Sequence, residues 1–548
     1  MACISRQNVG KYTYLYESVS FRDQNGRPRN KKVSIGKIDS VTGKPVFKKE
    51  YLERMAAAGT PIEQESPSIP RETLEIARNI LASNKRYGSM YLFLKLANSI
   101  NLLPLLQNAF SVQFREIFTL ACFLVESQEP LLYCEEWLSQ TESMPLLNST
   151  LSSQRISELF TAMTENQRDE FYSSWIEQAQ ENEYIALDIT SISSYSQLLE
   201  SSEWGYNRDH EDLPQINLCM LFGEDSRLPI YQTSYRGSLK DVTTLRTTLE
   251  EVTSLVPGCA IRIVMDKGFY SRKNIDEMLN PDRPVHFLVS VPFTSAFAKK
   301  QVESVQKDIH DLDYTIPTPD GGLQGIHKVR TWHTDMRNAK LHMHIYLNSV
   351  RQVTERTKLY TYITELKREA LKNPDNPQYA AEFKKYLIIR NSSKSSEGLT
   401  VNVRKDVIAK KMQNCGWMVL LSDSVDNAEE ALTIYRAKDV VEKSFSRLKN
   451  TLDLNRLRVH NDERMENKLF ISFIALLLIS ELHQRMLRDG LYKTYTMHEL
   501  LLKVRKLRVA RLNGKRIVQP ISKEQHEIFK ALGIAVWIRC RPQCSWQK

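Results

Sequence analysis

Two short apolar stretches, Tyr184-Ile-Ala-Leu-Asp188 and Ile261-Arg-Ile-Val-Met-Asp266, each end in an aspartate. Short runs rich in Ile, Val and aromatic residues predict β-strands. Between them we expect strands at residues 216–222 and 228–235 and a helix at 243–256. The first three strands predict an antiparallel meander, and the later stretch is the fourth strand. A mixed α/β region therefore begins near residue 183.

Two further elements, a helix at 271–279 and a strand at 285–291, follow the fourth strand. If the first and fourth strands are neighbours in one sheet, Asp188 and Asp266 lie side by side. A helix packed on that sheet could bring Glu442 to the same point. Three converging carboxylates are hard oxygen ligands suited to Mg²⁺ or Mn²⁺. Alternatively, each aspartate is an ordinary turn or helix cap. The chain has 65 acidic residues, and an acid that ends a strand usually has such a role.

Asp426 or Asn427 can cap a late helix that contains Tyr435 to Leu448 and would carry Glu442. On a helix of 3.6 residues per turn, Tyr435, Lys438, Glu442 and Lys449 share one face. The adjacent apolar stripe consists of Ile434, Val441, Phe445 and Leu448. The apolar stripe could pack on the sheet while the polar face meets the metal site. An ordinary amphipathic helix with an internal Lys438–Glu442 pair would show the same spacing.

Positive charge concentrates at both ends of the 548-residue chain, whose net charge is +10. Residues 1–55 hold twelve Lys or Arg against five acids, and residues 503–516 hold seven against none. Such a distribution is typical of proteins that bind a polyanion such as nucleic acid. The alternative for the run at 503–516 is a solvated helix.

The spacing of Tyr435, Lys438, Glu442 and Lys449 resembles the Tyr-Arg-Glu-Lys signature of a group of bacterial insertion-sequence transposases. The second position is usually Arg in that family and is Lys here, which cannot hold a phosphate bidentately. Further segments that resemble the group are 184–190, 205–210 with 213–215, 236–241, 266–270 and 453–460. The resemblance is clear over 183–295 and 430–485, weak at the N-terminus and poor elsewhere.

The resemblance implies an α/β fold: a ribonuclease-H-like mixed sheet with a β-rich insertion between the second aspartate and the glutamate. The alternation of apolar and polar residues at 11–36 predicts an N-terminal small β unit, and the helical periodicity of 72–180 predicts an all-helical domain. Five domains are expected. A basic β-hairpin unit at 1–58 binds DNA, and a helical domain at 72–180 binds DNA ends. The catalytic core consists of 183–295 and 431–490, with a β-rich insertion at 296–430 between its two parts, and a basic C-terminal region at 491–548 serves DNA contact or dimerisation.

The resemblance further implies that Asp188, Asp266 and Glu442 are catalytic and hold two Mg²⁺ or Mn²⁺ ions. Two such ions can activate the attacking oxygen and stabilise the leaving oxygen of a phosphodiester. Relatives of known mechanism cut both element ends and join the freed 3′-hydroxyls to target DNA, a cut-and-paste reaction. The expected partners are double-stranded DNA, as terminal inverted repeats and target, and a second copy in a homodimer.

Residues expected to contact DNA fall into three groups. By analogy, Tyr435, Lys438 and Lys449 would grip phosphates near the cleaved end. Arg27, Arg29, Lys31 and Lys32 would bind the terminal repeats from the N-terminal unit. An aromatic residue of the insertion could stack on a flipped base. Trp332 and Trp417 are the candidates, and the alternative for both is an ordinary place in the core.

No membrane association is expected, because the strongest apolar run, residues 469–482, is shorter than the about 20 residues that span a bilayer. A buried helix is predicted there instead. The eight scattered cysteines suit a reducing compartment such as the bacterial cytoplasm, around the nucleoid. Two other functions stay open: a DNA-binding protein derived from a transposase but inactive, and a ribonuclease-H-like nuclease that does not join strands.

Overall fold

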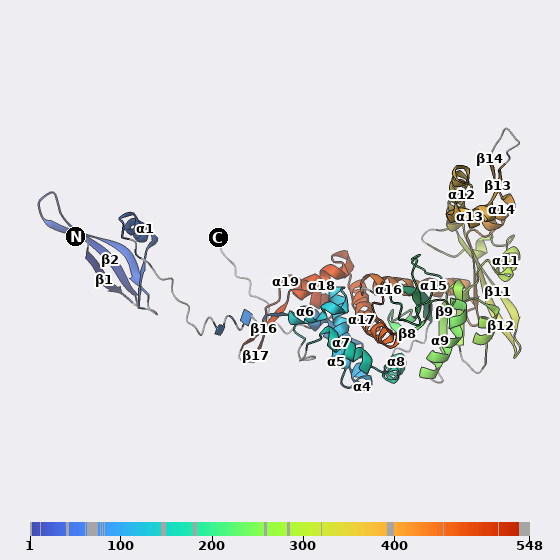
Figure 1. Cartoon of the computed structure of the whole chain (residues 1–548), viewed down its shortest axis with the longest axis horizontal. Coiled ribbons are helices and arrows are strands. Elements are labelled where there is room, and N and C mark those ends of the chain that lie inside the picture. Colours follow the sequence, from blue (N-terminus) through green and yellow to red (C-terminus); the bar gives the residue numbers. More distant parts are fainter. Residues whose placement is uncertain are drawn as a thin grey trace. The chain divides into compact units, whose positions relative to one another are not determined.

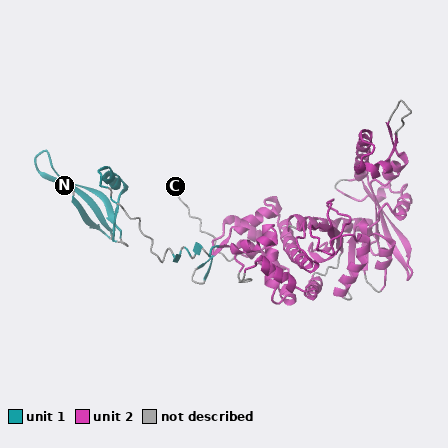
Figure 2. Ribbon diagram, viewed as in Figure 1, with its two compact units in different colours: residues 1–84, 510–517 teal, residues 85–509, 518–548 magenta. Residues whose placement is uncertain are grey.

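The computed structural model describes residues 3–10, 12–39, 43–60, 62, 75–76, 78, 80–81, 83–143, 150–178, 184–256, 260–281, 285–318, 321–391, 399–452, 454–512 and 515–535. Asp453 and residues 536–548, which belong to segments singled out above, lie outside this set. The chain divides into a small unit, residues 1–84 with 510–517, and a large unit made of the remainder (Figure 2).

The small unit contains an antiparallel sheet of four strands in the order β1-β2-β3-β4, with helix α1. The elements are β1 (Cys3–Val9), β2 (Tyr12–Arg22), β3 (Pro28–Ile38), β4 (Pro45–Phe47) and α1 (Lys49–Ala57). The carboxylate of Asp23 accepts hydrogen bonds from the backbone N–H groups of Asn25 and Arg27, which closes the turn between β2 and β3. Leu15, Ile35 and Tyr51 form the buried centre of this unit.

The large unit is built on a mixed sheet of eight strands in the order β11-β12-β15-β10-β9-β6-β7-β8. The strands are β6 (Ile185–Ser193), β7 (Gln215–Gly223), β8 (Pro229–Arg236), β9 (Ile261–Met265), β10 (Val285–Ser290), β11 (Leu323–His333), β12 (Asn338–Asn348) and β15 (Trp417–Ser422). Strands β6, β7 and β8 form the predicted antiparallel meander, which is confirmed. Strand β9 runs parallel to both β6 and β10.

Segment 296–430, expected as a β-rich insertion, is divided in the structure. Strands β11, β12 and β15 extend the large sheet beyond β10, where their backbone groups satisfy an edge that would otherwise be unpaired. The part between β12 and β15 is mainly helical (Figure 1). It comprises α12 (Ser349–Lys372), α13 (Ala380–Tyr386), the hairpin of β13 (Leu387–Asn391) and β14 (Leu399–Val403), and α14 (Lys405–Gln413).

Helices cover both faces of the sheet, as the alternation of its side chains requires. On one face, Val264, Leu288 and Leu420 pack with helix α15 (Ala428–Ala437). The intervening residues Ile263 and Phe287 belong to the main core, which includes α9 (Asp241–Leu255) and α10 (Arg272–Met278). Helix α16 (Asp439–Asn450) contacts β6 and β7 through its apolar stripe.

Residues 83–178 are mainly helical. The helices are α3 (Gly88–Ser99), α4 (Leu102–Ala109), α5 (Phe114–Ser127), α6 (Cys134–Ser139), α7 (Ser153–Ala162) and α8 (Glu165–Gln178). Helices α3, α5 and α7 pack against α17 (Asp462–Arg488), which also contacts β8 and α16 and is buried throughout residues 467–480. The buried helix predicted at 469–482 is confirmed, because a helix that is apolar all round needs neighbours on every side.

No single helix among the described residues is long and apolar enough to cross a membrane. The bent pair of α3 and α4 passes that test by length and composition only, and its apolar side chains are largely buried against other helices.

Candidate active site

The two candidate aspartates occupy corresponding positions on neighbouring parallel strands. Ala186 of β6 pairs with Val264 of β9, and Leu187 pairs with Met265. One residue further along, Asp188 stands beside Asp266, which directly follows β9. Since side chains alternate across a strand, both aspartates share the face on which Val264 packs against α15. The predicted neighbourhood of the first and fourth strands is therefore confirmed.

The environment of Asp188 disfavours its negative charge. Burial, and more weakly the charge of Asp266, raise the pKa of Asp188 to about 6. Lys438, the backbone N–H of Ile189 and Arg208 act in the opposite direction. That N–H donates to Oδ1 of Asp188 at 2.9 Å. Burial and the negative charge of Asp266 both disfavour the ionised carboxylate of Asp188. A cation bound at this site would stabilise that ionised form.

Tyr435 joins helix α15 to the end of β9. Its hydroxyl donates a hydrogen bond of 2.9 Å to Oδ1 of Asp266. Burial, followed by the negative charge of Asp266, raises the pKa of the Tyr435 phenol, so the group is a neutral donor. The tyrosine thus orients one oxygen of Asp266 and leaves the other available.

The prediction of a single helix that contains residues 435–448 is wrong, because the structure has two helices that meet at Lys438. Helix α15 ends at Ala437, α16 begins at Asp439, and Lys438 is the junction. The two helices contact different strands: α15 lies over β9, β10, β11 and β12, and α16 lies over β6 and β7. A single straight helix could not contact both sets of strands. Tyr435 and Glu442 therefore belong to different helices.

Glu442 is connected to the aspartates through Lys438. The buried Lys438 amine lies 3.4 Å from Oε1 of Glu442, whose side chain is 62% exposed. The same amine lowers the pKa of Asp188, so one cation serves both carboxylates. Within the described part of the chain, no three His, Cys, Asp or Glu side chains meet closely enough to hold one metal ion. The convergence of Glu442 with the two aspartates therefore stays a prediction.

The donor chemistry of the site fits a hard divalent cation. The apolar stretch that ends at Asp188 is not the end of its strand: Asp188 lies within β6, which continues to Ser193. Asp266 directly follows β9, and the exposed Glu442 lies on the first turn of α16, so all three can offer carboxylate oxygens. Lys438 provides positive charge between these acids. Side chains of this kind would leave positions for water and phosphate oxygens around an ion.

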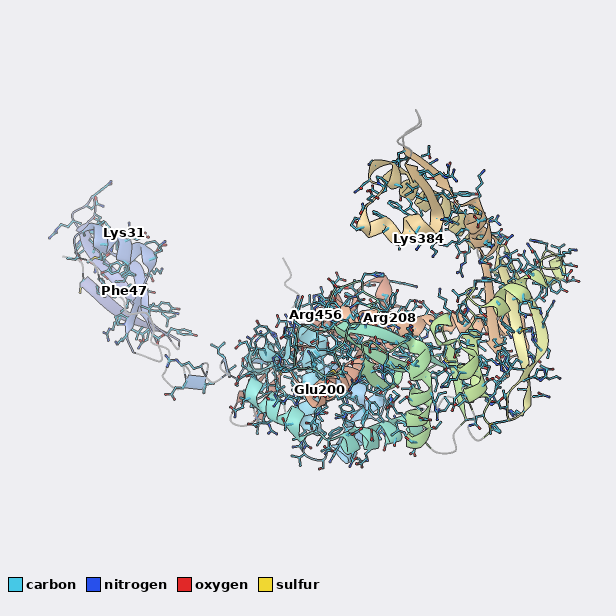
Figure 3. The ribbon with its side chains drawn as sticks, turned by 45° about the vertical axis from the view of Figure 1, so that its right-hand side comes forward. Lys31, Phe47, Glu200, Arg208, Lys384 and Arg456 are labelled. Carbon is cyan, nitrogen blue, oxygen red and sulfur yellow. The ribbon has the colours of Figure 1, made fainter. Side chains whose placement is uncertain are left out.

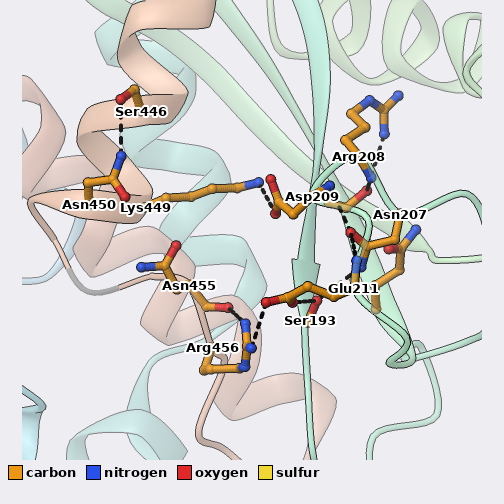
Figure 4. Close-up of polar contacts among 12 residues, drawn as sticks. Ser193, Asn207, Arg208, Asp209, Glu211, Ser446, Lys449, Asn450, Asn455 and Arg456 are labelled. Atoms are coloured by element: carbon orange, nitrogen blue, oxygen red, sulfur yellow. Dashed lines mark hydrogen bonds and ion pairs between the residues drawn. The ribbon is translucent and has the colours of Figure 1, made fainter. Parts of the chain in front are cut away.

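Lys449 is held in an ion pair. Its amine lies 2.6 Å from Oδ2 of Asp209, and its side chain is 11% exposed. Nearby, Arg456 lies 2.7 Å from Oε1 of Glu211, which also accepts a hydrogen bond from Ser193 (Figure 4). These contacts attach the C-terminal end of α16 and the segment after it to the loop between β6 and β7.

Arg208 is a residue of the site that sequence reasoning missed. Its guanidinium lies 2.5 Å from Oδ1 of Asp241 and 3.4 Å from Oγ of Ser191, and it lowers the pKa of Asp188. Figure 3 shows it in the same part of the large unit as Arg456. Asp241 in turn lies against Gly268, where a Cβ would come within 2.9 Å of Oδ2 of Asp241.

Three of the segments singled out in the sequence therefore meet at one point. Arg208 belongs to 205–210, Asp241 to 236–241 and Gly268 to 266–270. The signal that could have found Arg208 was its place in one of these segments.

A cleft of about 850 Å³ adjoins Asp266 and Tyr435. It lies between the end of the sheet and the helices α12 and α14. Four cations, two acids and four aromatic residues stand among its lining side chains: Lys267, Arg351, Lys358 and Lys411; Asp266 and Glu355; Phe293, Tyr362, Trp417 and Tyr435. Cations interleaved with aromatic rings suit a nucleic-acid strand, since they match phosphates and bases.

The two candidate tryptophans differ in their surroundings. Trp417 is buried at the start of β15 and lines the cleft. Trp332 is also buried, its indole N–H donates to Asp276 at 2.7 Å, and it is not among the lining residues of the cleft. The candidates in the small unit, Arg27, Arg29, Lys31 and Lys32, are all exposed on or beside β3, and Arg29 forms an ion pair with Asp23.

These observations define a mixed α/β domain with adjacent aspartates on two neighbouring parallel strands, one within β6 and one directly after β9. A family model described as "Transposase DDE domain" matches residues 180–478, more than half of the chain. The chain belongs to this family of DDE-type transposases. The match includes Asp188, Asp266, Glu442 and the cleft.

Comparison with individual proteins adds little. No curated protein matches the sequence. A cryo-EM structure of a piggyBac transposase synaptic complex with hairpin DNA is similar at 10% identity and a TM-score of 0.34, covering 72% of this chain and 70% of that chain. At that score the likeness supports no inference about this chain.

Proposed function

We propose that the chain is a DNA transposase that binds the terminal inverted repeats of a bacterial insertion sequence, cleaves them and joins the 3′-hydroxyls to target DNA. The observation that carries this proposal is the pairing of Asp188 and Asp266 on neighbouring strands, in a chain of the transposase DDE family. The order β8-β7-β6-β9-β10, an antiparallel meander followed by two parallel strands, supports a ribonuclease-H-like core.

In this proposal Asp188, Asp266 and Glu442 are the catalytic carboxylates and hold two Mg²⁺ or Mn²⁺ ions. When bound, such ions supply Lewis acidity and a template for phosphodiester chemistry. Tyr435 holds one oxygen of Asp266 in place, and Arg208 and Lys438 limit the repulsion between the acids. Glu442 is exposed at the first turn of α16, so its side chain could turn from Lys438 toward the aspartates.

The cleft beside Asp266 would receive the DNA strand that is cut. Lys267, Arg351, Lys358 and Lys411 are suited to its phosphates, and Trp417 to stacking on a base. Lys438 and Lys449 would grip phosphates near the cleaved end by exchanging their carboxylate partners for phosphate oxygens, which are also anionic acceptors.

The spacing Tyr435, Lys438, Glu442 and Lys449 supports membership of the subgroup with the Tyr-Arg-Glu-Lys signature. The small unit, through Arg27, Arg29, Lys31 and Lys32, and the helices of 83–178 would recognise the terminal repeats. Two ends must be joined together, so we propose a homodimer on paired ends. A bacterial cytoplasmic location around the nucleoid stays a prediction.

One observation favours a second candidate, a DNA-binding protein that no longer cleaves. Glu442 is exposed and contacts Lys438, the cation next to the aspartates. A nuclease that cannot join strands is the third candidate. The three differ in their products.

The test incubates the full chain with DNA that carries both ends of the element encoding it, a supercoiled target plasmid and Mg²⁺ or Mn²⁺. Joined products on a gel are expected. Cleavage without joining would favour the nuclease, and binding without cleavage in either ion would favour the inactive protein. The same incubation without divalent ions is the control.

A further inference from the structure

A second basic pocket lies in the large unit, outside the residues that the family model matches. Its volume is about 420 Å³. It forms where helix α18 (Met497–Arg505) meets strand β16 (Arg508–Leu512) and its partner β5 (Lys85–Arg86). Seven residues line it: Arg86, Glu499, Leu502, Lys503, Arg505, Lys506 and Arg508. Five of these are cations and one is an acid, so the pocket carries an excess of positive charge.

The fold brings two of these cations face to face. Arg86 and Arg508 are direct partners in the antiparallel pairing of β5 with β16. Like charges placed directly opposite each other destabilise a sheet. The pKa of Arg86 is lowered, first by burial and then by the charge of Arg505; the nearby Glu126 raises it, and the charge of Arg508 lowers it. An anion bound between these side chains would offset their repulsion.

Acids behind and beside the pocket hold two of the other cations. Arg505 lies 3.8 Å from Oε1 of Glu126, a carboxylate buried beneath it on α5. Lys503 lies 2.8 Å from Oε1 of Glu524 on helix α19 (Lys523–Ala531). Lys506, at the end of α18, is exposed. The cations are thus positioned by packing and ion pairs, and their donors line an open pocket.

We propose that this pocket binds the phosphodiester backbone of duplex DNA at a point separate from the cleavage cleft. The proposal rests on the proposed function, because it assigns a second contact to the same DNA substrate. Arginine forks match phosphate oxygens bidentately, and lysine adds point charge. The five cations outnumber the three neighbouring acids, Glu126, Glu499 and Glu524, so the pocket keeps a net positive charge. Duplex DNA, with one negative charge per about 1.7 Å of axis, presents several phosphates at once.

The test measures how DNA binding depends on salt. The full chain and a variant with Arg86→Gln, Lys506→Gln and Arg508→Gln are titrated against a labelled duplex of arbitrary sequence at several salt concentrations. The slope of log K against log salt falls in magnitude by about 0.9 for each phosphate that the protein no longer neutralises. We therefore expect the slope of the variant to be smaller by about 2 to 3 and its affinity to be weaker.

A matched control removes three exposed lysines that do not line the pocket: Lys493→Gln, Lys523→Gln and Lys530→Gln. It loses the same net charge and should keep the slope of the unaltered chain. An equal fall in both variants would overturn the proposal, since the effect would then follow net charge alone. An unchanged slope in the pocket variant would also overturn it.

Two further measurements make the outcome decisive. If thermal unfolding shows that the triple variant does not fold, the single variant Lys506→Glu, at an exposed position, is used in its place. Titration of inorganic phosphate identifies a small-anion site: if phosphate binds and the DNA slope of the pocket variant is unchanged, the proposal fails. Failure of the proposed function is distinguishable, because DNA binding with this slope change but no strand joining would leave the pocket assignment intact.

Discussion

The hydroxyl of Tyr435 lies 2.9 Å from Oδ1 of Asp266, across 169 positions of the sequence. This hydrogen bond joins helix α15 to the end of β9 at the point where β9 meets β6 and Asp188. It gives the aspartate one defined orientation. Lys438 supplies the neighbouring positive charge, three positions further along the chain. Tyr435 and Lys438 therefore both act on the carboxylate pair from the α15 side.

Replacing Tyr435 by Phe should reduce strand cleavage about 10- to 100-fold, because a hydrogen bond to a charged group contributes about 1.5–3 kcal/mol. The Mg²⁺ concentration needed for half-maximal cleavage should rise. Tyr346→Phe is the matched control, since the Tyr346 hydroxyl donates to the backbone of Ala428 on the same helix. Equal losses in the two variants would show that Tyr435 supports only the packing of α15.

Asp188→Asn, Asp266→Asn and Glu442→Gln should each abolish cleavage while leaving binding of the element ends largely intact. Removing a metal ligand takes away several kcal/mol of transition-state stabilisation, so the rate should fall by at least about a thousand-fold. Gel assays of cleavage and of end binding on the same preparation measure both effects. Full activity in any one variant would exclude that residue from the catalytic set.

Replacing Lys31 and Lys32 by Gln should weaken binding of the element ends and lower the salt slope by about 0.9 for each phosphate that is no longer neutralised. Adding Arg27→Gln and Arg29→Gln should lower it further. These side chains are exposed, so stability should change little. Lys48→Gln with Lys49→Gln provides a control in the same unit. If this control weakens binding equally, β3 is not the contact surface.

Glu126→Gln should stabilise the protein above acidic pH. Burial raises the pKa of Glu126, while Arg505, Ser89, Arg86 and Trp137 around it lower that pKa less. A carboxyl whose pKa is higher in the folded than in the unfolded state stabilises the fold below its unfolded pKa. This contribution is lost as pH rises through the folded value.

The free energy of unfolding, measured by denaturant titration between pH 4 and pH 8, should therefore fall with pH more steeply in the unaltered chain than in the Glu126→Gln variant. The difference between the two curves isolates this residue from other buried acids such as Glu466. Parallel curves would mean that folding does not change the pKa of Glu126.

The strands of the catalytic region could be predicted because each is a short apolar run that ends at a turn or an acid. Strands β7, β8 and β9 lie within or close to such runs, whereas β6 begins in one and continues past Asp188 to Ser193. The neighbourhood of Asp188 and Asp266 followed once β9 was placed beside β6. The contribution of β11, β12 and β15 to the same sheet was not foreseen, because the local sequence of a strand does not specify which other strand it pairs with.

The break between α15 and α16 at Lys438 could not be predicted from the sequence either. Residues 435–449 keep a helical period of apolar residues throughout, so local sequence favours one continuous helix. The helix is divided because α15 packs on β9, β10, β11 and β12, whereas α16 packs on β6 and β7. Arg208 was missed for a related reason: its partners Asp241 and Ser191 are distant in sequence, and its place in segment 205–210 does not by itself identify them.

The amino-acid sequence by itself determined which side chains are available: two aspartates after apolar strands, the spaced Tyr435 and Glu442, and basic runs at both ends. Periodicity is a local property, so it could be seen without a structure. Tertiary structure alone decided that Lys438 stands between Asp188 and Glu442, that Lys449 pairs with Asp209, and that Arg86 faces Arg508. Electrostatic energies depend on distance and burial, and both are set by packing between segments far apart in the chain.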